Sequence, residues 1–274
     1  MKICIAGKNN IAVNAVDYLI HTKKFPKDDL IIIVNQNDTG VDSWQKSLKK
    51  YALDNNLSVS PLEQVYDIED LVFISLEFDK IIKTEKFKTK KFFNIHFSNL
   101  PKYKGMYTAV MPILKGETKA GVTLHRIDNG IDTGEIIDQI IFDLKLEDTS
   151  RDLYFNYLKH GFELFKKNID MLLTNNFTST KQNKNGASYY SKQEIDFRNI
   201  KIDFKKTSYE IYNQIRAFIF QEYQLPAINN SKIAKVVLTD EFVGYNQFSD
   251  TEKELIISGI DGYKIRAIKE SKNR

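Results

Sequence analysis

Residues 92–100 read FFNIHFSNL, and the alternation within this stretch predicts a β-strand. Its apolar members alternate with polar ones, which is the period-two pattern of a strand, and they are Phe93, Ile95 and Phe97. The side chains of Asn94 and His96 are therefore expected on the same side of the strand. A strand end in an open α/β sheet is where ligands usually bind, and a buried amide and imidazole there need a partner.

A second stretch, residues 121–134 with the sequence GVTLHRIDNGIDTG, supplies a carboxylate. It predicts a strand, a tight turn at 128–130 and a loop that carries Asp132. If this loop folds back, the carboxylate of Asp132 can meet the imidazole of His96. An amide that stabilises an oxyanion, an imidazole that moves a proton and a carboxylate that orients the imidazole together suit acyl transfer to nitrogen.

The order of these residues resembles the family of formyltransferases that use 10-formyltetrahydrofolate. The motifs are N-x-H, S-x-L-P-x-x-x-G and D-x-G-x-D-T-G, and they follow one another between Asn94 and Gly134. The resemblance implies 10-formyltetrahydrofolate as co-substrate and Asn94, His96 and Asp132 as the catalytic set. It also implies that the loop after residue 76 lines the folate pocket, largely through backbone groups. The cofactor-binding positions that it implies are Phe78, Asp79, Lys80, Ile81, Ile82 and Asp128.

Structural explanations exist for the separate parts of the pattern. A lone histidine on a strand is more often structural than catalytic, and Asp, Asn and Gly at 128–134 favour turns for their own reasons. Asp128 is expected to form such a turn. The run lacks the closing Glu of a calcium loop, and His21, His125 and His160 stand apart from any Cys or paired His. No metal is expected.

Composition limits the class of protein. The chain has 274 residues, 42% hydrophobic and 28% charged, and no apolar run approaches the roughly 18 residues of a membrane span. The opening MKICIA is too short for the core of a signal peptide, so a cytoplasmic protein without membrane contact is expected. The single cysteine, Cys4, lies between Ile3 and Ile5 and is expected to be a buried thiol.

Strand and helix patterns alternate along the first part of the chain. Strands are predicted at 2–7, 30–37, 57–61 and 71–76, and helices after residue 10, at 43–54, at 107–117 and from 149 to 172. This alternation predicts an α/β fold, with a Rossmann-like, mostly parallel sheet and helices on both faces. The first turn, GKNN, matches neither the dinucleotide nor the NTP phosphate-binding loop.

Residues 174–188 are rich in Asn, Thr, Lys and Ser and predict a linker. Two domains are therefore expected, a catalytic domain at 1–185 and a small, mainly β domain at 186–274 for substrate contacts and dimerisation. Short antiparallel strands are predicted at 233–242, 253–260 and 262–270. Exposed edges at VVLT and LIIS would be covered in a homodimer built largely by residues after about 199, which the resemblance to sugar-modifying members also suggests.

The acceptor amine leaves three hypotheses. The first is an amino sugar on a nucleoside diphosphate, the second is methionyl-tRNA, and the third is a folate-binding or regulatory module without activity. The intact catalytic set argues against the third, and a net charge of +4 is low for a protein that tracks a nucleic acid. A sugar-modifying enzyme is expected, with no nucleic acid as partner.

The expected substrate is a dTDP-linked amino-dideoxy sugar, with 4-amino-4,6-dideoxyglucose as the choice, for O-antigen or other surface polysaccharide synthesis. Nothing in the residues separates a 4-amino from a 3-amino sugar. Residues 214–227, QIRAFIFQEYQLPA, are similar to a segment of sugar-modifying members, although Arg216 and Phe220 could equally be an ion pair and core. The candidate substrate-binding residues are Lys8, Asn9, Met106, Tyr107, Arg216, Phe220 and Tyr223.

Overall fold

The computed structural model describes residues 1–271, which divide into two compact units. The first unit comprises residues 1–105, 121–141 and 156–189. The second comprises residues 106–120, 142–155 and, within the described part, 190–271. Each unit is therefore assembled from several segments of the chain, and a domain boundary at residues 185 and 186 stays a prediction.

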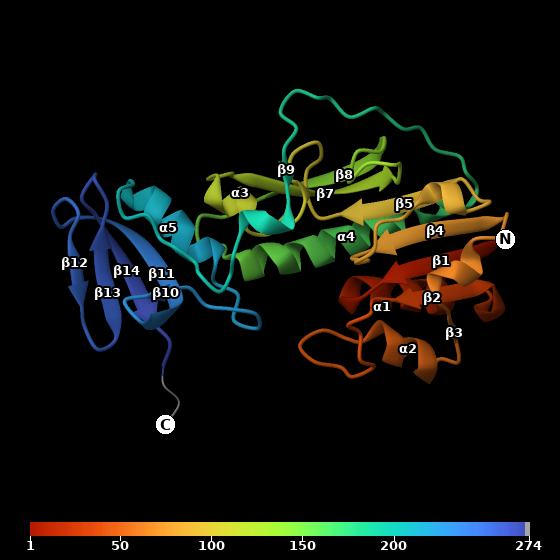
Figure 1. The fold of residues 1–274 in the computed structure, drawn as a ribbon, viewed down its shortest axis with the longest axis horizontal. Coiled ribbons are helices and arrows are strands. Elements are labelled where there is room, and N and C mark those ends of the chain that lie inside the picture. The colour runs from red at the N-terminus through yellow and green to blue at the C-terminus, as the bar shows by residue number, and fades with distance from the viewer. Residues whose placement is uncertain (272–274) are drawn as a thin grey trace. The chain divides into compact units, whose positions relative to one another are not determined.

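A seven-stranded sheet has the order β3-β2-β1-β4-β5-β7-β8 (Figure 1). Its first five strands in that order pair in parallel, and β5 pairs with β7 in antiparallel fashion. The predicted Rossmann-like, mostly parallel sheet is thus confirmed. The strands are β1 (Lys2–Gly7), β2 (Leu30–Val34), β3 (Ser58–Val59), β4 (Leu71–Leu76), β5 (Lys91–His96), β7 (Lys119–Arg126) and β8 (Ile136–Asp143).

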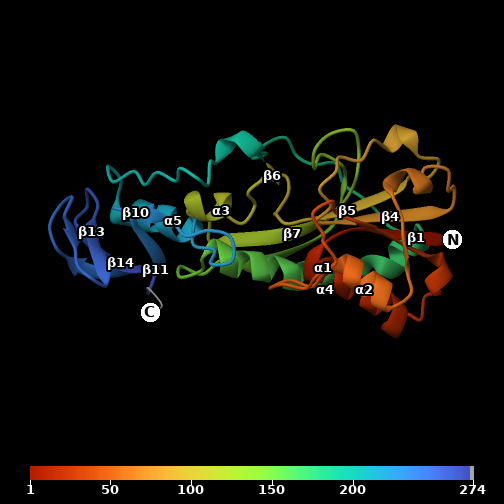
Figure 2. The same cartoon turned by 60° about the horizontal axis from the view of Figure 1, so that its bottom comes forward.

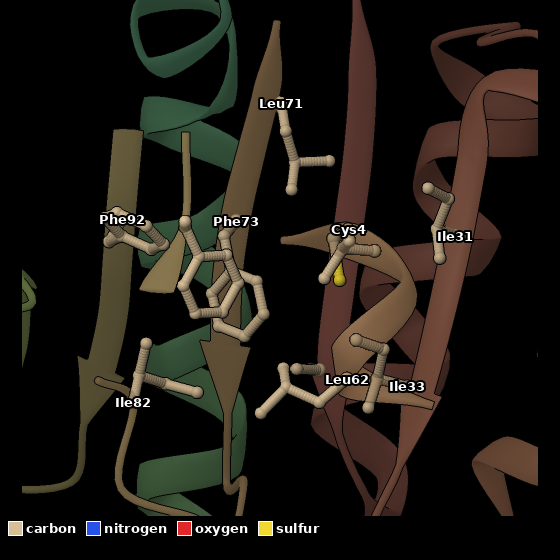
Figure 3. Close-up of a cluster of buried hydrophobic side chains, with 11 residues drawn as sticks. Cys4, Ile31, Ile33, Leu62, Leu71, Phe73, Ile82 and Phe92 are labelled. Carbon is tan, nitrogen blue, oxygen red and sulfur yellow. The ribbon is translucent and has the colours of Figure 1, made fainter. Parts of the chain in front are cut away.

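The central strands form because their apolar runs are buried on both faces. Every residue of β4 is buried, as a parallel strand covered by helices and loops requires. Figure 3 shows the cluster on one face, with α4 (Ser150–Leu173) behind the strands on the other. The cluster contains Cys4, Ala6, Ile31, Ile33, Leu62, Val65, Leu71, Phe73, Ile82, Phe87 and Phe92, so the expectation of a buried Cys4 thiol is confirmed.

The helices follow the predicted pattern with shifted ends. Helix α1 (Asn9–Asp17) runs into a π-helical turn at Tyr18–Thr22 and packs beside α2 (Figure 2). Helix α2 spans Leu48–Asp54 rather than 43–54, because Ser47 is its N-cap and accepts the Lys50 N–H. The helix predicted at 107–117 is only α3 (Met111–Leu114), with Pro112 in its first turn as expected.

The second unit contains a five-stranded antiparallel sheet in the order β10-β11-β14-β13-β12. Helix α5 (Ser208–Ala217) packs on it and begins with a capping box between Thr207 and Glu210. The predicted C-terminal strands are confirmed. They are β10 (Ala227–Ile228), β11 (Ser231–Phe242), β12 (Phe248–Asp250), β13 (Glu254–Ser258) and β14 (Tyr263–Lys269).

Short elements complete the chain. A two-stranded sheet joins β6 (Lys104–Gly105) to β9 (Tyr189–Tyr190). The 3-10 turns are Lys27–Asp29, Leu62–Val65, Thr84–Lys86 and Lys192–Glu194.

Candidate active site

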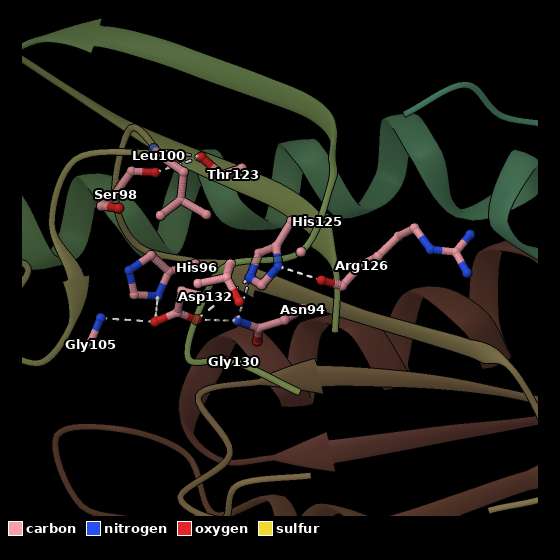
Figure 4. Close-up of polar contacts among 12 residues, drawn as sticks. Asn94, His96, Ser98, Leu100, Gly105, Thr123, His125, Arg126, Gly130 and Asp132 are labelled. Carbon is pink, nitrogen blue, oxygen red and sulfur yellow. Dashed lines mark hydrogen bonds and ion pairs between the residues drawn. The ribbon is translucent and has the colours of Figure 1, made fainter. Parts of the chain in front are cut away.

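The candidate site lies in the first unit, where β5 ends. Strand β5 carries Asn94 and His96, and in the antiparallel register with β7 Asn94 lies opposite His125. Asp132 lies in the turn between β7 and β8, in the left-handed backbone region with φ of 54°. Figure 4 shows the side chains of Asn94, His96 and Asp132 pointing toward one another, so the structure brings the predicted catalytic set together.

The imidazole of His96 is held between a carbonyl and a carboxylate. Its Nε2 lies 2.9 Å from the carbonyl oxygen of Tyr103, and a carbonyl only accepts, so Nε2 carries a proton. Its Nδ1 lies 3.5 Å from Oδ2 of Asp132, an ion-pair distance longer than an ordinary hydrogen bond. Nδ1 is therefore the nitrogen that can gain or lose a proton, with a carboxylate opposite it.

The carboxylate of Asp132 meets donors on both oxygens. The Gly105 N–H donates to Oδ2 at 2.9 Å, and Nδ2 of Asn94 donates to Oδ1 at 3.4 Å. Burial raises the pKa of this carboxyl, but the neighbouring imidazoles of His96 and His125 and the hydrogen bond from the Gly105 N–H together lower that pKa to about 2. Asp132 is consequently an anion throughout the physiological pH range.

Burial changes the pKa of the His96 imidazole in the opposite direction. Only 9% of His96 is exposed, and desolvation lowers the pKa of its imidazole, although the charge of Asp132 and the Tyr103 carbonyl both raise it. The imidazole is thus neutral at neutral pH and able to accept a proton at Nδ1. A neutral base beside a permanent anion is the arrangement that stabilises an imidazolium as it forms.

His125 is a site residue that the sequence patterns did not single out. Its Nδ1 donates to the Arg126 carbonyl at 2.7 Å, which leaves Nε2 to accept from Nδ2 of Asn94 at 3.1 Å. The same Nε2 lies 3.6 Å from Oδ1 of Asp132. Only the register of β5 against β7 reveals the pairing, because the sequence gives no measure of strand register.

The turn that carries Asp132 depends on small residues and on Asp128. A Cβ at Gly134 would lie 1.8 Å from the Arg126 carbonyl oxygen, so the loop can return against β7 only with glycine there. Oδ1 of Asp128 accepts from the Gly130 N–H at 3.0 Å and from the Thr133 hydroxyl at 2.6 Å. Asp128 is therefore a turn former, as expected, and its cofactor contact stays a prediction.

The positions predicted to line the folate pocket follow β4 directly. Residues 78–83 lie in neither helix nor strand, so their backbone groups stand outside both hydrogen-bond ladders. Phe78 packs against the buried cluster and Ile82 belongs to it, whereas Asp79 and Lys80 are exposed and Ile81 is 70% exposed. Backbone recognition of a flat heterocycle fits this loop, and the contacts themselves stay a prediction.

The substrate-binding candidates lie in both units. In the first unit, Lys8 and Asn9 follow β1, and Nδ2 of Asn9 donates to Oε2 of Glu77, just after β4, at 3.2 Å. In the second unit, Met106 is exposed and the Tyr107 hydroxyl donates to the Lys192 carbonyl at 2.6 Å.

The aromatic and cationic candidates of residues 216–223 differ in accessibility. Tyr223 is 59% exposed, whereas Phe220 is buried and only 1% of Arg216 is exposed. The Arg216 guanidinium donates to the Asp148 carbonyl and to Oδ1 of Asn213, and burial lowers its pKa. Phe220 thus occupies the core position of the alternative interpretation, whereas Arg216 is buried rather than part of an exposed ion pair. Its phosphate contact stays a prediction that this placement does not favour.

Two negative findings concern residues 1–271. His, Cys, Asp and Glu side chains within this range form no group of three or more that could hold a metal ion. In the same range, none of the helices has the length and apolar character needed to cross a membrane.

Residues 49–169 match the model of the family described as formyl transferase. A methionyl-tRNA formyltransferase of Fervidobacterium nodosum is 28% identical over 230 residues, which cover 80% of this chain and 71% of that protein. The bifunctional polymyxin resistance protein ArnA of Wigglesworthia glossinidia brevipalpis is 33% identical over 150 residues, 54% of this chain and 22% of that protein.

Two solved structures are much more similar. WlaRD, a sugar 3N-formyl transferase crystallised with dTDP and 5-N-formyl-THF, is 58% identical with a TM-score of 0.96, and the match covers 99% of this chain and 98% of WlaRD. An N-formyltransferase from Helicobacter canadensis, in complex with folinic acid and dTDP-3-aminofucose, is 57% identical with a TM-score of 0.96. That match covers 98% of this chain and 100% of the other.

The contact between His96 and Asp132 predicts a specific titration. We expect NMR to show the imidazole of His96 titrating below the value near 6.5 that it has in the urea-unfolded chain, because burial lowers its pKa. In Asp132→Asn, the loss of the raising charge should move the midpoint to still lower pH. A midpoint that rises in Asp132→Asn would contradict this description of the pair.

Proposed function

This chain belongs to the formyl transferase family, and we propose that it transfers the formyl group of 10-formyltetrahydrofolate to the amine of a dTDP-linked amino-dideoxy sugar. The observation that carries the chemistry is the neutral imidazole of His96 with its Nδ1 3.5 Å from the Asp132 carboxylate. The observation that carries the substrate class is the 58% identity to WlaRD over nearly the whole of both chains.

The reaction can be written with these residues. The amine nitrogen attacks the formyl carbon, and the carbonyl oxygen becomes an oxyanion that Nδ2 of Asn94 can stabilise. To do so, the Asn94 amide must exchange one of its partners, His125 or Asp132, for the substrate oxygen. Nδ1 of His96 takes the proton of the amine, Asp132 stabilises the imidazolium, and the bond from carbon to N10 of the folate breaks as N10 gains a proton.

The comparisons support a proposal for the position of the amine on the sugar ring. The sequence expectation was 4-amino-4,6-dideoxyglucose, and the residues offered no basis for the choice of carbon. The two similar structures are of a sugar 3N-formyl transferase and of a complex with dTDP-3-aminofucose. They favour a 3-amino sugar, so we infer this ring position and keep the 4-amino sugar as the alternative to test.

The proposal also covers the use of the product and the residues that bind the substrate. A formamido sugar on a dTDP carrier would serve O-antigen or other surface polysaccharide synthesis. We assign the approach of the amine to Lys8 and Asn9, which follow the carboxyl end of β1 beside β4, the point where the strand order reverses. Met106, Tyr107 and the exposed ring of Tyr223 are the further substrate-binding candidates that remain accessible or partly accessible.

The alternative function is formylation of methionyl-tRNA, for which the 28% identity to the Fervidobacterium enzyme is the specific observation. The net charge of +4 argues against it, because a protein that neutralises several phosphates needs a dense basic surface. The identities of 57 and 58% to two sugar-modifying enzymes are also much higher than the 28% identity to the Fervidobacterium enzyme.

Mass spectrometry decides the acceptor. Incubation with 10-formyltetrahydrofolate and separate dTDP-linked 3-amino and 4-amino dideoxy sugars should add one formyl group to the 3-amino sugar. Exclusive formylation of the 4-amino isomer would overturn the ring position. Formylation of methionyl-tRNA alone would overturn the proposed substrate class.

The general base has a direct test. His96→Asn should lower kcat by on the order of a hundredfold to ten-thousandfold while calorimetry still shows substrate binding, because only proton transfer is removed. Circular dichroism should confirm that the variant is folded. Turnover close to that of the unchanged enzyme would rule out His96 as the base.

We also propose a homodimer formed through the second unit. The expected free edge at residues 255–258 is corrected by the structure, since β13 pairs with both β12 and β14. Residues 236–238 of β11 pair with β14, whereas β10 pairs only with Ser231 and Lys232 on the other side of β11. Three exposed aromatic side chains support an interface, and they are Phe242, Tyr245 and Tyr263.

Sedimentation at micromolar concentration should show twice the chain mass of 31.8 kDa. Tyr245→Asp should shift the protein toward monomer, because an interface would bury the new charge without a partner. Val41→Asp, which changes an exposed apolar residue of the first unit, serves as the control and should stay dimeric. Monomer alone in the unchanged protein would contradict the proposal.

A further inference from the structure

The connection between α4 and β9 does more than join two parts of the chain. Composition predicts a linker at 174–188, and Figure 1 shows this segment as a long extended path without helix. Residues 156–189 nevertheless belong to the first unit. The segment 179–188, called the strap here, is anchored beside β8, since Thr180 and Ile136 exchange two backbone hydrogen bonds of 2.8 and 2.9 Å.

Gln182 on the strap holds the backbone of the catalytic carboxylate. Its Nε2 donates to the carbonyl of Asp132 at 2.8 Å and to the carbonyl of Gly134 at 2.8 Å. One amide nitrogen carries two hydrogens, so it can satisfy both carbonyls at once. Gln182 therefore fixes the peptide group that follows Asp132 and the one that follows Gly134, in a turn whose Asp132 has the uncommon φ of 54°.

Ser188 on the same strap holds the segment that faces the imidazole. Its hydroxyl accepts the Tyr103 N–H at 2.8 Å, and its carbonyl accepts the Lys104 N–H at 2.9 Å. The carbonyl of Tyr103 is the acceptor for Nε2 of His96, and Gly105 donates to Oδ2 of Asp132. The strap thus reaches both loops that fix the distance between Nδ1 and the carboxylate.

The environment of Gln182 favours a role beyond packing. Its Oε1 is buried and has no hydrogen-bond partner among the described residues. A buried acceptor without a partner destabilises the fold, so this side chain is not the best choice for stability alone. What it provides at that cost is a donor to the two carbonyls of the catalytic turn.

We propose that Gln182, with Ser188 on the same strap, is a positioning residue that holds the Asp132 carboxylate opposite Nδ1 of His96 during formyl transfer. This inference rests on the proposed function, because the His96 base is the group that it serves. Neither residue is offered as a contact of the substrate or the folate. Their effect reaches the reaction only through the geometry of the pair.

The direction in which the pH profile of kcat/KM should shift follows from the groups that face His96. The titratable groups that act on the imidazole are Asp132, whose charge raises its pKa, and His125 of β7, which lowers it; the Tyr103 carbonyl also raises it. If Asp132 withdraws, the pKa of His96 falls further. The acid limb of kcat/KM, where His96 becomes protonated, should then move to lower pH.

Gln182→Met tests the proposal, because Met keeps the volume but lacks the amide donor. We expect kcat to fall about 10- to 100-fold, as is usual for groups that orient a functional residue. KM should stay within about threefold, and the acid limb of kcat/KM should move to lower pH, as in Asp132→Asn. Ser188→Ala, which removes only the Tyr103 acceptor, should lower kcat as well and provides a second variant if Gln182→Met does not fold.

Ser179→Ala is the matched control on the same strap. Its hydroxyl donates to the side chain of Glu135, at Oε2, at 2.6 Å and not to the backbone carbonyls of Asp132 and Gly134, so its kcat and pH profile should be unchanged. An unchanged kcat in both Gln182→Met and Ser188→Ala, or a loss of kcat with an unmoved acid limb, would overturn the proposal. Inactivity of the unchanged enzyme on every amino sugar would instead overturn the proposed function, so the two failures are distinguishable.

Discussion

The structure of the first unit depends on keeping one ionised carboxylate largely out of water. The side chain of Asp132 is 13% exposed, and an ionised group removed from water costs several kcal/mol unless charge and hydrogen bonds replace the solvent. These replacements come from separate parts of the chain, since Gly105, Asn94 and His96 all face the carboxylate. Any change that removes one of these contacts leaves a buried charge less compensated.

The sheet explains how such distant segments meet. Parallel strands end at one edge, so the segments that follow β1, β4 and β5 gather there. Strand β7 pairs with β5 in antiparallel fashion, which places His125 opposite Asn94 and ends β7 opposite Phe93. The loop after β7 therefore has to fold back against that strand, with Gly134 close to the Arg126 carbonyl, to bring Asp132 to His96.

His96 and Asp132 respond to the same burial in opposite ways. Desolvation penalises the charged form of each, so it favours neutral imidazole and protonated carboxyl alike. For Asp132, the donors around it outweigh that penalty and lower its pKa to about 2. For His96, desolvation prevails and its pKa is lowered. The result is a neutral base beside a lasting anion, which is the combination that proton transfer from an amine requires.

The sequence by itself determined the local and periodic features. Alternation in FFNIHFS fixed Asn94 and His96 on one side of a strand, buried apolar runs indicated the parallel sheet, and the ordered motifs identified Asp132. Tertiary structure alone decided that His125 faces Asn94, that Arg216 is buried and that Gln182 and Ser188 bind the backbone of Asp132 and Tyr103. The physical reason is that periodicity reports which way a side chain points within its own element, whereas contacts between distant segments depend on strand register and chain path, which no local pattern records.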